Sequence, residues 1–250
     1  MRTILNVENL FKSFGKTTVL NNINFEVKEG DFISIMGHSG SGKSTLLYSI
    51  SGMDKPTSGK VFLCNQEISN LADAEMSELR LSKMGFVFQH SYLLKNLSIK
   101  DNIVLPGFKL ARKSRDQVND HADALLEKTG ITHVADHDIK KVSGGQLQRA
   151  AICRALINQP VILFGDEPTG ALNSSTSKEV LDIINRINNE GTTVILVTHD
   201  VKVAARSDEI IYLMDGNIED RMTLGKYEND NMRTKAREKK LYEWLEAKGL

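Results

Sequence analysis

The stretch from Gly37 to Thr45, GHSGSGKST, carries residue types that can bind phosphate. It fits the pattern GxxxxGK[S/T], in which a glycine-rich backbone directs N–H groups at a phosphate and the next helix adds its positive N-terminus. Lys43 can reach the outer phosphates, and the Ser44 hydroxyl can bind Mg²⁺. The predicted phosphate-binding loop comprises Gly37, His38, Ser39, Gly40, Ser41, Gly42, Lys43, Ser44 and Thr45.

The residues around this loop favour a phosphate-binding function over a chance glycine-rich turn. FISIM, at 32–36, predicts a buried strand, and TLLYSI, at 45–50, predicts the start of a helix. A strand, a glycine-rich loop and a helix in this order form the context that the pattern requires. We therefore expect the loop to lie at the carboxyl edge of a sheet.

Two carboxylates end a second apolar strand, VILFGDE, which runs from Val161 to Glu167. The carboxyl edge of an open α/β sheet is where ligands bind, so Asp166 can hold Mg²⁺ opposite Ser44. Glu167 suits a residue that orients or deprotonates an attacking water. An acidic pair at a strand end is common by itself, and the phosphate-binding loop is what favours a functional interpretation here.

Two further polar residues follow predicted strands. His199 ends TVILVTH and Gln89 ends MGFVFQ, which places both at the same sheet edge as Asp166. Gln89 can reach a metal ion or a water molecule there. A structural histidine and an ordinary strand-end glutamine are the alternatives, because neither residue type is informative alone.

Composition limits the classes of protein that this chain can represent. Its 250 residues are 40% hydrophobic and 26% charged, which predicts a globular protein, and its net charge of zero gives no reason to expect nucleic-acid binding. No apolar run approaches the roughly 18 residues of a membrane helix. Cys64 and Cys153 lie far apart without metal-ligand spacing, which is typical of a reducing cytoplasm.

The order of predicted elements indicates an α/β protein with a parallel-sheet core. Alternating residues at 3–8 and 22–28 predict antiparallel strands, whereas the continuous apolar runs after 160 predict parallel strands covered on both faces. We expect one domain at 1–225: an antiparallel β subdomain plus core at 1–89 and 160–225, and an inserted helical subdomain at 90–159. Residues 226–250 predict a charged helical extension, whose apolar edge of Leu241, Trp244 and Leu245 would pack on the chain itself, on a twin subunit or on a membrane.

The segment VSGGQ supplies a second anion-binding feature within the predicted helical region. Ser143, Gly144, Gly145 and Gln146 precede the helix LQRAAICRAL, and two anion-binding helix N-termini are more than one nucleotide site needs. A glycine-rich helix cap is the simpler alternative. Nearby, His133, Asp136, His137 and Asp138 could be metal ligands, although such a loop cluster is common surface chemistry.

Five motifs in this order resemble the ATP-binding subunit of ABC transporters: the phosphate-binding loop, Gln89, VSGGQ, FGDEPTGALN and VTHD. The resemblance covers roughly residues 3 to 220 and implies the RecA-like fold of P-loop NTPases. It implies a head-to-tail homodimer in which ATP and Mg²⁺ at Gly37 to Thr45 of one subunit are enclosed by Ser143 to Gln146 of the other. It also implies that Phe14 stacks on adenine.

The resemblance implies catalytic roles as well. Glu167 would be the catalytic carboxylate, His199 would sense the γ-phosphate, and Gln89 would link the nucleotide to a separate membrane-spanning permease subunit. The protein would then lie at the cytoplasmic face of the membrane, held there by its permease. One departure from the family pattern is Asn173, where aspartate is usual, which puts in question the role of that loop in communication between the two sites.

The segments FGDEPTGALNSSTSKEV and LLKNLSIKDNIVLP resemble the branch with lipoprotein-releasing, macrolide-efflux and bacitracin-type antimicrobial-peptide resistance transporters. The charged tail and the motif sequences as a whole resemble the peptide-resistance group most. Two other classes remain open. A soluble ABC ATPase acting on ribosomes or DNA would usually carry two ATPase domains or a long coiled-coil insertion. A P-loop small-molecule kinase would leave VSGGQ and His199 without a role.

Overall fold

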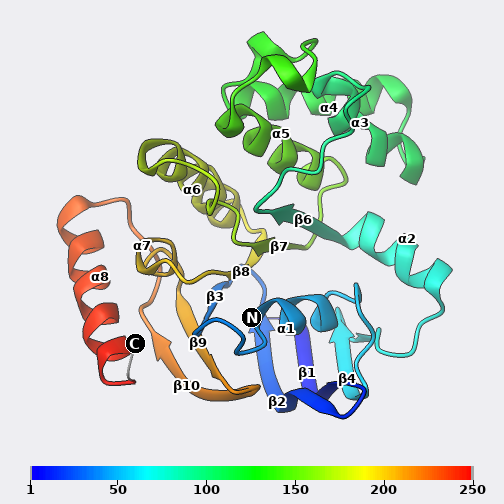
Figure 1. The fold of residues 1–250 in the computed structure, drawn as a ribbon. Coiled ribbons are helices and arrows are strands. Elements are labelled where there is room, and N and C mark those ends of the chain that lie inside the picture. Colours follow the sequence, from blue (N-terminus) through cyan, green and yellow to red (C-terminus); the bar gives the residue numbers. More distant parts are fainter. Residues whose placement is uncertain (1, 249–250) are drawn as a thin grey trace. The chain divides into compact units, whose positions relative to one another are not determined.

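The computed structural model describes residues 2–248, which form two compact units. The first unit contains the chain up to Leu71 and from Asn188 onward, and the second contains Ala72–Ile187. Together they have the α/β fold of P-loop NTPases, with parallel strands and an antiparallel sheet. We describe each unit separately (Figure 1).

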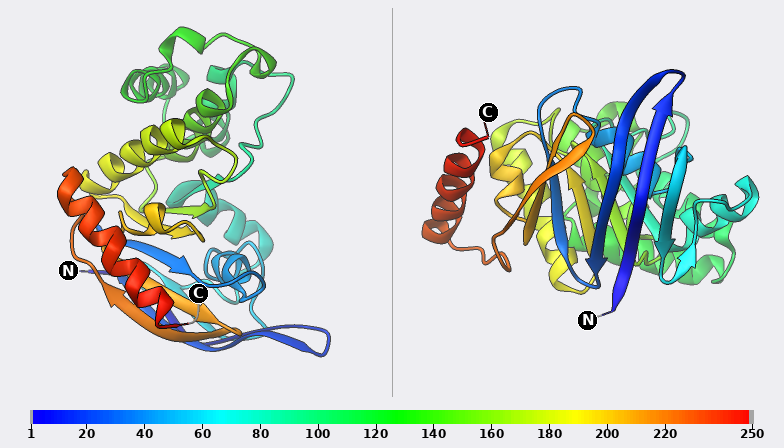
Figure 2. Two further views of the ribbon diagram at one scale, coloured as in Figure 1. Left: turned by 60° about the vertical axis from the view of Figure 1, so that its left-hand side comes forward. Right: turned by 90° about the horizontal axis from the view of Figure 1, so that it is seen from below.

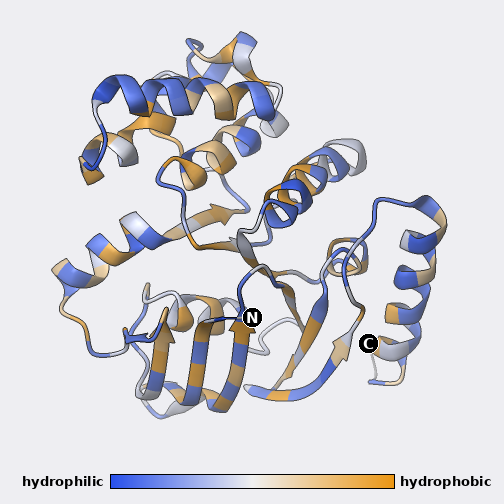
Figure 3. Ribbon diagram, turned by 180° about the vertical axis from the view of Figure 1, so that it is seen from behind, coloured by the Kyte–Doolittle hydropathy of each residue, from blue (hydrophilic) through white to orange (hydrophobic). Residues whose placement is uncertain are grey.

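An antiparallel sheet forms one part of the first unit. Its strand order is β2-β1-β4-β5, with the bounds Thr17–Lys28, Thr3–Phe14, Ser58–Leu63 and Gln66–Glu67. Strands β1 and β2 meet in a two-residue hairpin whose first loop residue, Gly15, has a φ of 60°, as tight hairpins require. Apolar and polar residues alternate along these strands, which is visible as alternating colours in Figure 3.

Parallel strands form the other part of the first unit. Strand β3 (Phe32–Met36) pairs in parallel with β8 (Thr193–Val197) and with β9 (Glu209–Met214). Every residue of β3 and β8 is buried, as expected for parallel strands covered on both faces. The unit is completed by β10 (Asn217–Thr223), antiparallel to β9, and by the helices α1 (Lys43–Ile50) and α7 (Val201–Ala204).

The C-terminal helix α8 (Asn231–Glu246) packs on the first unit beside α7, as Figures 1 and 2 show. Leu241 and Leu245 are buried against Tyr212 and Met222, and the ring of Trp244 meets that of Tyr212 edge to face at 5.9 Å. The expectation that this apolar edge packs on the chain itself is confirmed. The last two residues of the predicted extension, 249–250, lie outside the described residues.

The second unit combines two parallel strands with helices. Strands β6 (Met84–Phe88) and β7 (Ile162–Asp166) pair in parallel. Among the helices, α3, α4 and α5 pack on one another, and each begins with a serine cap and a partner side chain three residues later. The helices are α2 (Asp73–Lys83), α3 (Ile99–Leu110), α4 (Arg115–Lys128), α5 (Gly144–Leu156) and α6 (Ser174–Asn189), the last of which ends in the first unit.

The structure extends the sequence-based expectations in two places. The predicted strands at 3–8 and 22–28 are parts of the longer strands β1 and β2, which both extend as far as the hairpin turn at Gly15. Strand β10 was not expected: its sequence, NIEDRMT, is mostly polar, and it pairs with a neighbour on one side. Among the described residues, no helix combines the length and the apolar character needed to cross a membrane.

Candidate functional site

The phosphate-binding loop connects β3 to α1 in the first unit. Gly37, Gly40 and Gly42 have φ angles of 152°, 83° and 99°, which disfavour any residue with a side chain. A Cβ on Gly37 would collide with the Leu213 carbonyl oxygen, and a Cβ on Gly42 would lie 3.0 Å from the Val19 carbonyl oxygen. The backbone is therefore packed closely on its own unit, with no space for side chains at these two positions.

The polar side chains of the loop suit a bound phosphate. The Lys43 ammonium donates to the carbonyl oxygens of Gly37 and His38, at 2.8 and 2.7 Å, which holds it across the loop. The Ser41 hydroxyl is buried and has no hydrogen-bond partner within the described residues. A cradle of this shape, with an ammonium and an unsatisfied hydroxyl, fits an anion that accepts hydrogen bonds.

Phe14 and His199 also belong to the first unit. Phe14 ends β1, and its ring is 54% exposed, with the Lys12 ammonium 4.7 Å from the ring centroid. An exposed aromatic face of this kind can stack on a base. His199 is exposed immediately after β8, and Asp200 then caps α7 by accepting a hydrogen bond from the Lys202 backbone N–H.

Gln89 and Glu167 lie close together in the second unit. A Cβ on Gly170 would lie 3.1 Å from Gln89 Nε2 and 3.2 Å from Glu167 Oε2, so both side chains end beside this glycine. Glu167 has a φ of 48°, a left-handed conformation that is uncommon for a residue with a long side chain. Asp166 ends β7 directly before it. The second unit thus places Asp166, Gln89 and Glu167 at the ends of β6 and β7, with Glu167 in a strained backbone conformation.

The signature segment, which we define as Ser143 to Gln146, forms the N-terminus of α5. The Ser143 hydroxyl accepts from the Gln146 backbone N–H at 3.3 Å, and Gln146 Oε1 accepts from the Ser143 N–H at 2.8 Å. The signature segment therefore also forms a helix cap, which was the simpler alternative. Ser98 and Ser114 cap α3 and α4 in the same way. Ser143 and Gly144 are nevertheless exposed, which leaves this helix end accessible.

Gly145 distinguishes the signature segment from the serine caps of α3 and α4. Gly145 is buried, and a Cβ on it would collide with Thr176 Cγ2 in the first turn of α6. Asn173, the residue that departs from the family pattern, accepts hydrogen bonds from the Thr176 N–H and the Ser175 hydroxyl. Because asparagine caps a helix as well as aspartate does, the local structure of this loop survives the substitution.

We predict that Gly145→Ala lowers ATP hydrolysis about tenfold, because the added methyl group displaces the signature segment from α6. The double variant with Thr176→Ser removes the colliding methyl group and should restore most of the activity. Steady-state hydrolysis by the three proteins checks this. Failure of Thr176→Ser to restore activity would contradict the packing explanation.

The suggested metal ligands in the loop before the signature segment do not form a metal site. Within residues 2–248, no group of three or more histidine, cysteine, aspartate or glutamate residues could hold a metal ion. His133 instead lies 3.2 Å from Gln146, with its Nε2 facing the Gln146 amide nitrogen. Asp138 caps the short helix Ile139–Lys141 by accepting from the Lys140 backbone N–H.

No sequence motif marks the side chains that connect α5 to the rest of the second unit. Gln148 is 2% exposed and donates to the carbonyl oxygens of Phe88 and Pro168. Arg154 donates to the carbonyl oxygens of Ser91 and Tyr92, both at 2.7 Å, and burial lowers its pKa. A polar residue at a buried position of a helix is the signal that could have suggested such contacts.

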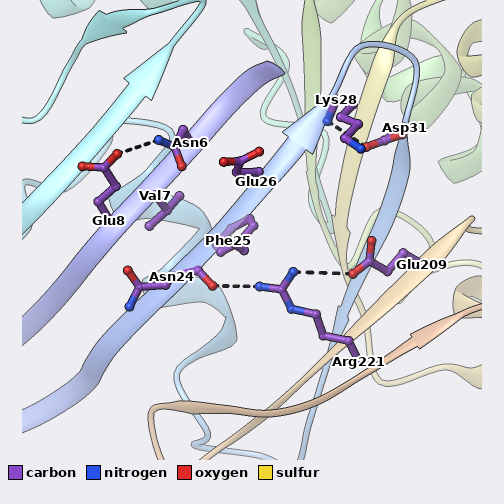
Figure 4. A pocket seen from close by; sticks show the side chains of 10 residues that line it. All are labelled: Asn6, Val7, Glu8, Asn24, Phe25, Glu26, Lys28, Asp31, Glu209 and Arg221. Carbon is purple, nitrogen blue, oxygen red and sulfur yellow. Dashed lines mark hydrogen bonds and ion pairs between the residues drawn. The ribbon is translucent and has the colours of Figure 1, made fainter. Parts of the chain in front are cut away.

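A polar groove on the first unit lies apart from the expected nucleotide-binding residues. It has a volume of about 770 Å³ and is lined mainly by residues of β1 and β2, together with Asp31, Glu209 and Arg221 (Figure 4). Arg221 spans it, donating to the Asn24 carbonyl oxygen and pairing with Glu209 at 3.7 Å. Burial raises the pKa of Glu209, and Arg221 partly offsets this shift. Arg221 thus satisfies acceptors on two sides of the groove.

A comparison with known families finds a match over residues 20–170 to the family described as "ABC transporter". The lipoprotein-releasing system ATP-binding protein LolD of Aquifex aeolicus is 41% identical over 87% of this chain and 97% of its own length. The macrolide export ATP-binding/permease protein MacB of Campylobacter fetus is 44% identical over 86% of this chain, which corresponds to 34% of that longer protein.

Solved structures give the same result. The post-hydrolysis dimer of the ATP-binding cassette MJ0796, bound to ADP and phosphate, superimposes with a TM-score of 0.82, at 39% identity over 90% of this chain and all of that one. A second dimeric structure of MJ0796 also has a TM-score of 0.82, at 40% identity. A protein of the same name from Methanocaldococcus jannaschii is 43% identical over 80% of this chain.

Proposed function

Because this chain belongs to the ABC transporter ATP-binding family, we propose that two copies assemble head to tail and couple ATP hydrolysis to a separate membrane-spanning permease. The chain is the ATPase subunit of an ABC transporter. The observation that carries the head-to-tail arrangement is the exposed N-terminus of α5, an anion-binding end that the chain's own phosphate-binding loop does not need. The signature segment of one subunit then completes the ATP site of the other.

The expected site residues divide into two groups in this proposal. The loop Gly37 to Thr45 binds the phosphates of ATP, and Phe14 stacks on the adenine. Ser44, Asp166 and Gln89 bind Mg²⁺, because a hydroxyl, a carboxylate and an amide oxygen are ligands of the kind that this ion prefers. Bound Mg²⁺ would neutralise negative charge on the phosphates.

The hydrolytic roles fall to Glu167 and His199. Glu167 accepts a proton from the attacking water, and its position beside Gln89 in the second unit supports this role. His199, exposed after β8, donates a hydrogen bond to the γ-phosphate. Bound ATP favours the closed dimer, and hydrolysis of that ATP favours the open dimer. The nucleotide thus shifts the balance between two populations of the same assembly.

A surface suited to the permease follows Gln89. Tyr92 and Leu94 are 66% and 52% exposed, although both are large and apolar, and Arg154 fixes the backbone at Tyr92. Exposed apolar residues next to a nucleotide-sensing glutamine fit a protein partner. We place the protein at the cytoplasmic face of the membrane, attached through this permease and without a role in nucleic-acid binding.

For the transporter's role we propose resistance to antimicrobial peptides of the bacitracin type, because the charged tail and the motif sequences resemble that group most. Lipoprotein release and macrolide efflux are the alternatives within the same branch, and the relatives LolD and MacB favour them. The phenotype of cells that lack the gene distinguishes these three roles. Sensitivity to bacitracin-type peptides alone supports our proposal, sensitivity to macrolides supports efflux, and retention of lipoproteins in the inner membrane supports release.

Co-purification tests the proposed assembly. The protein should co-purify from detergent with the membrane protein encoded beside it, and the double variant Tyr92→Ser/Leu94→Ser should lose this association while it still binds ATP. Tyr242→Ser, at an exposed tyrosine of α8, serves as the control and should retain the association. If the wild-type protein instead purifies with ribosomes or DNA and without a membrane protein, the alternative of a ribosome- or DNA-directed ATPase replaces our proposal.

A further inference from the structure

Gln148 connects three parts of the second unit through one side-chain amide. It lies on α5, two residues after the signature segment, and is 2% exposed. Its Nε2 donates to the Phe88 carbonyl oxygen at 2.8 Å and to the Pro168 carbonyl oxygen at 2.7 Å. Both hydrogens of the amide are thereby used, and the last residue of β6 and the segment just after β7 are bound to the same side chain.

The two carbonyl groups adjoin the two residues with expected roles in hydrolysis. Phe88 directly precedes Gln89, and Pro168 directly follows Glu167. The side chains of Gln89 and Glu167 end beside Gly170, so their separation depends on how the two backbone segments are held. Glu167 has a left-handed φ of 48°, a conformation that persists only when its surroundings impose it. The Gln148 amide is one such constraint, because it holds the next residue along the chain.

We propose that Gln148 is a positioning residue for hydrolysis, which fixes the backbone beside Gln89 and Glu167 from the helix that presents the signature segment. The inference rests on the head-to-tail dimer of the proposed function. In that dimer the signature segment acts on the partner's nucleotide, whereas Gln89 and Glu167 act on the subunit's own nucleotide. Helix α5 of each subunit therefore presents the signature segment to the partner's site, and Gln148 binds the backbone beside Gln89 and Glu167 of its own chain.

Substitution of Gln148 by methionine tests this role, because methionine has a similar length and donates no hydrogen bond. We expect kcat for ATP hydrolysis to fall about tenfold to a hundredfold, as small misplacements of reacting groups do. ATP affinity, measured without Mg²⁺, should change less than twofold, because the phosphate-binding loop and Phe14 belong to the first unit. This division between kcat and affinity distinguishes positioning from general loss of structure.

Asn158→Leu provides a matched control in the same unit. Asn158 also bridges two backbone carbonyl oxygens, donating to Leu81 at 2.8 Å and to Pro106 at 3.2 Å, and neither carbonyl adjoins an expected site residue. Both variants should lower the thermal midpoint, and only Gln148→Met should lower kcat in protein that remains folded. Equal kcat values for Gln148→Met, Asn158→Leu and the wild type would overturn the proposal.

A mixture of two inactive variants determines which site depends on Gln148. Subunits with Ser143→Arg lack a usable signature segment, and subunits with Lys43→Ala cannot hold ATP. In a head-to-tail pair of the two, one complete site remains, built on the phosphate-binding loop, Gln89 and Glu167 of the Ser143→Arg subunit. Hydrolysis by the mixture, absent from either variant alone, reports this site.

Gln148→Met is then added to one subunit at a time. Our proposal expects the loss of hydrolysis when the change is in the Ser143→Arg subunit, which supplies Glu167. A loss of equal or greater size with the change in the Lys43→Ala subunit would mean that Gln148 only supports the signature segment, and would overturn the proposal. If the unmodified mixture hydrolyses no ATP, the head-to-tail arrangement is wrong, and the kcat comparison with Asn158→Leu still decides the role of Gln148.

Discussion

Replacement of Glu167 by glutamine should lower ATP turnover by about a hundredfold or more while ATP binding is retained. Glutamine keeps the length and shape of the side chain and loses the carboxylate that accepts the proton of the attacking water. The phosphate-binding loop lies in the other compact unit, so its affinity for ATP should be unchanged. Unable to hydrolyse ATP, the variant should remain a dimer in ATP, which size-exclusion chromatography with light scattering detects.

Glu127→Gln is a suitable control for this experiment, since Glu127 is an exposed glutamate of α4 in the same unit. It should hydrolyse ATP at the wild-type rate and show no ATP-trapped dimer. Near-normal hydrolysis by the Glu167→Gln protein would remove Glu167 from the catalytic role. A hydrolysis-deficient protein that remained monomeric in ATP would argue against ATP-driven dimerisation instead.

Replacement of Arg237 by alanine should destabilise the first unit by about 2 to 4 kcal/mol. This guanidinium on α8 donates to the carbonyl oxygens of five residues and lies near the ring of Tyr227. Burial lowers its pKa, and these acceptors together with the Asp208 carboxylate stabilise the charge. Alanine would remove the donor to these carbonyl groups and weaken the attachment of α8, which Leu241 and Leu245 would still hold. The five acceptors are Ala205, Ser207, Leu224, Gly225 and Lys226.

Arg233→Ala is the matched control on the same helix. Arg233 forms an exposed ion pair with Glu228, and such pairs contribute little to stability. Its removal should change the free energy of unfolding by about 0.5 kcal/mol or less. Chemical denaturation of the wild type and the two variants measures the difference. Equal destabilisation by both substitutions would show that α8 contributes through its general charge rather than through the contacts of Arg237.

Sequence patterns located the elements that carry the nucleotide-binding motifs. The predicted strands FISIM at 32–36 and MGFVF before Gln89 match β3 and β6, because each is a short apolar run that ends at a clear signal. The expected fold class is confirmed, since the order of motifs and apolar strands in this family corresponds to one architecture. By contrast, the mostly polar β10 was missed because its pairing with β9 is a tertiary contact.

In the site, too, some features could be inferred from local sequence patterns and others depend on tertiary contacts. Glycine positions in the loop from Gly37 to Thr45 could be inferred because phosphate binding requires backbone groups, which leave a sequence pattern. The sequence predicted that Gln89 and Asp166 share a sheet edge, but it could not predict that the side chains of Gln89 and Glu167 end beside Gly170. Gln89 is 81 positions from that glycine, and only folding brings it near. A polar residue at a buried helix position could have suggested that Gln148 has a partner, but its acceptors are backbone carbonyl groups, which every residue has, so the sequence could not identify them.

The sequence by itself determined that this chain binds and hydrolyses a nucleotide as an ABC transporter subunit, because that chemistry depends on residue types at set spacings. Tertiary structure alone decided how the parts support one another. It placed Arg237 among five carbonyl groups, allowed Asn173 to keep its capping role, and joined the signature helix to the backbone beside Gln89 and Glu167 through Gln148. The physical reason is that burial and backbone hydrogen bonding depend on distances in space, to which spacing along the chain is a poor guide.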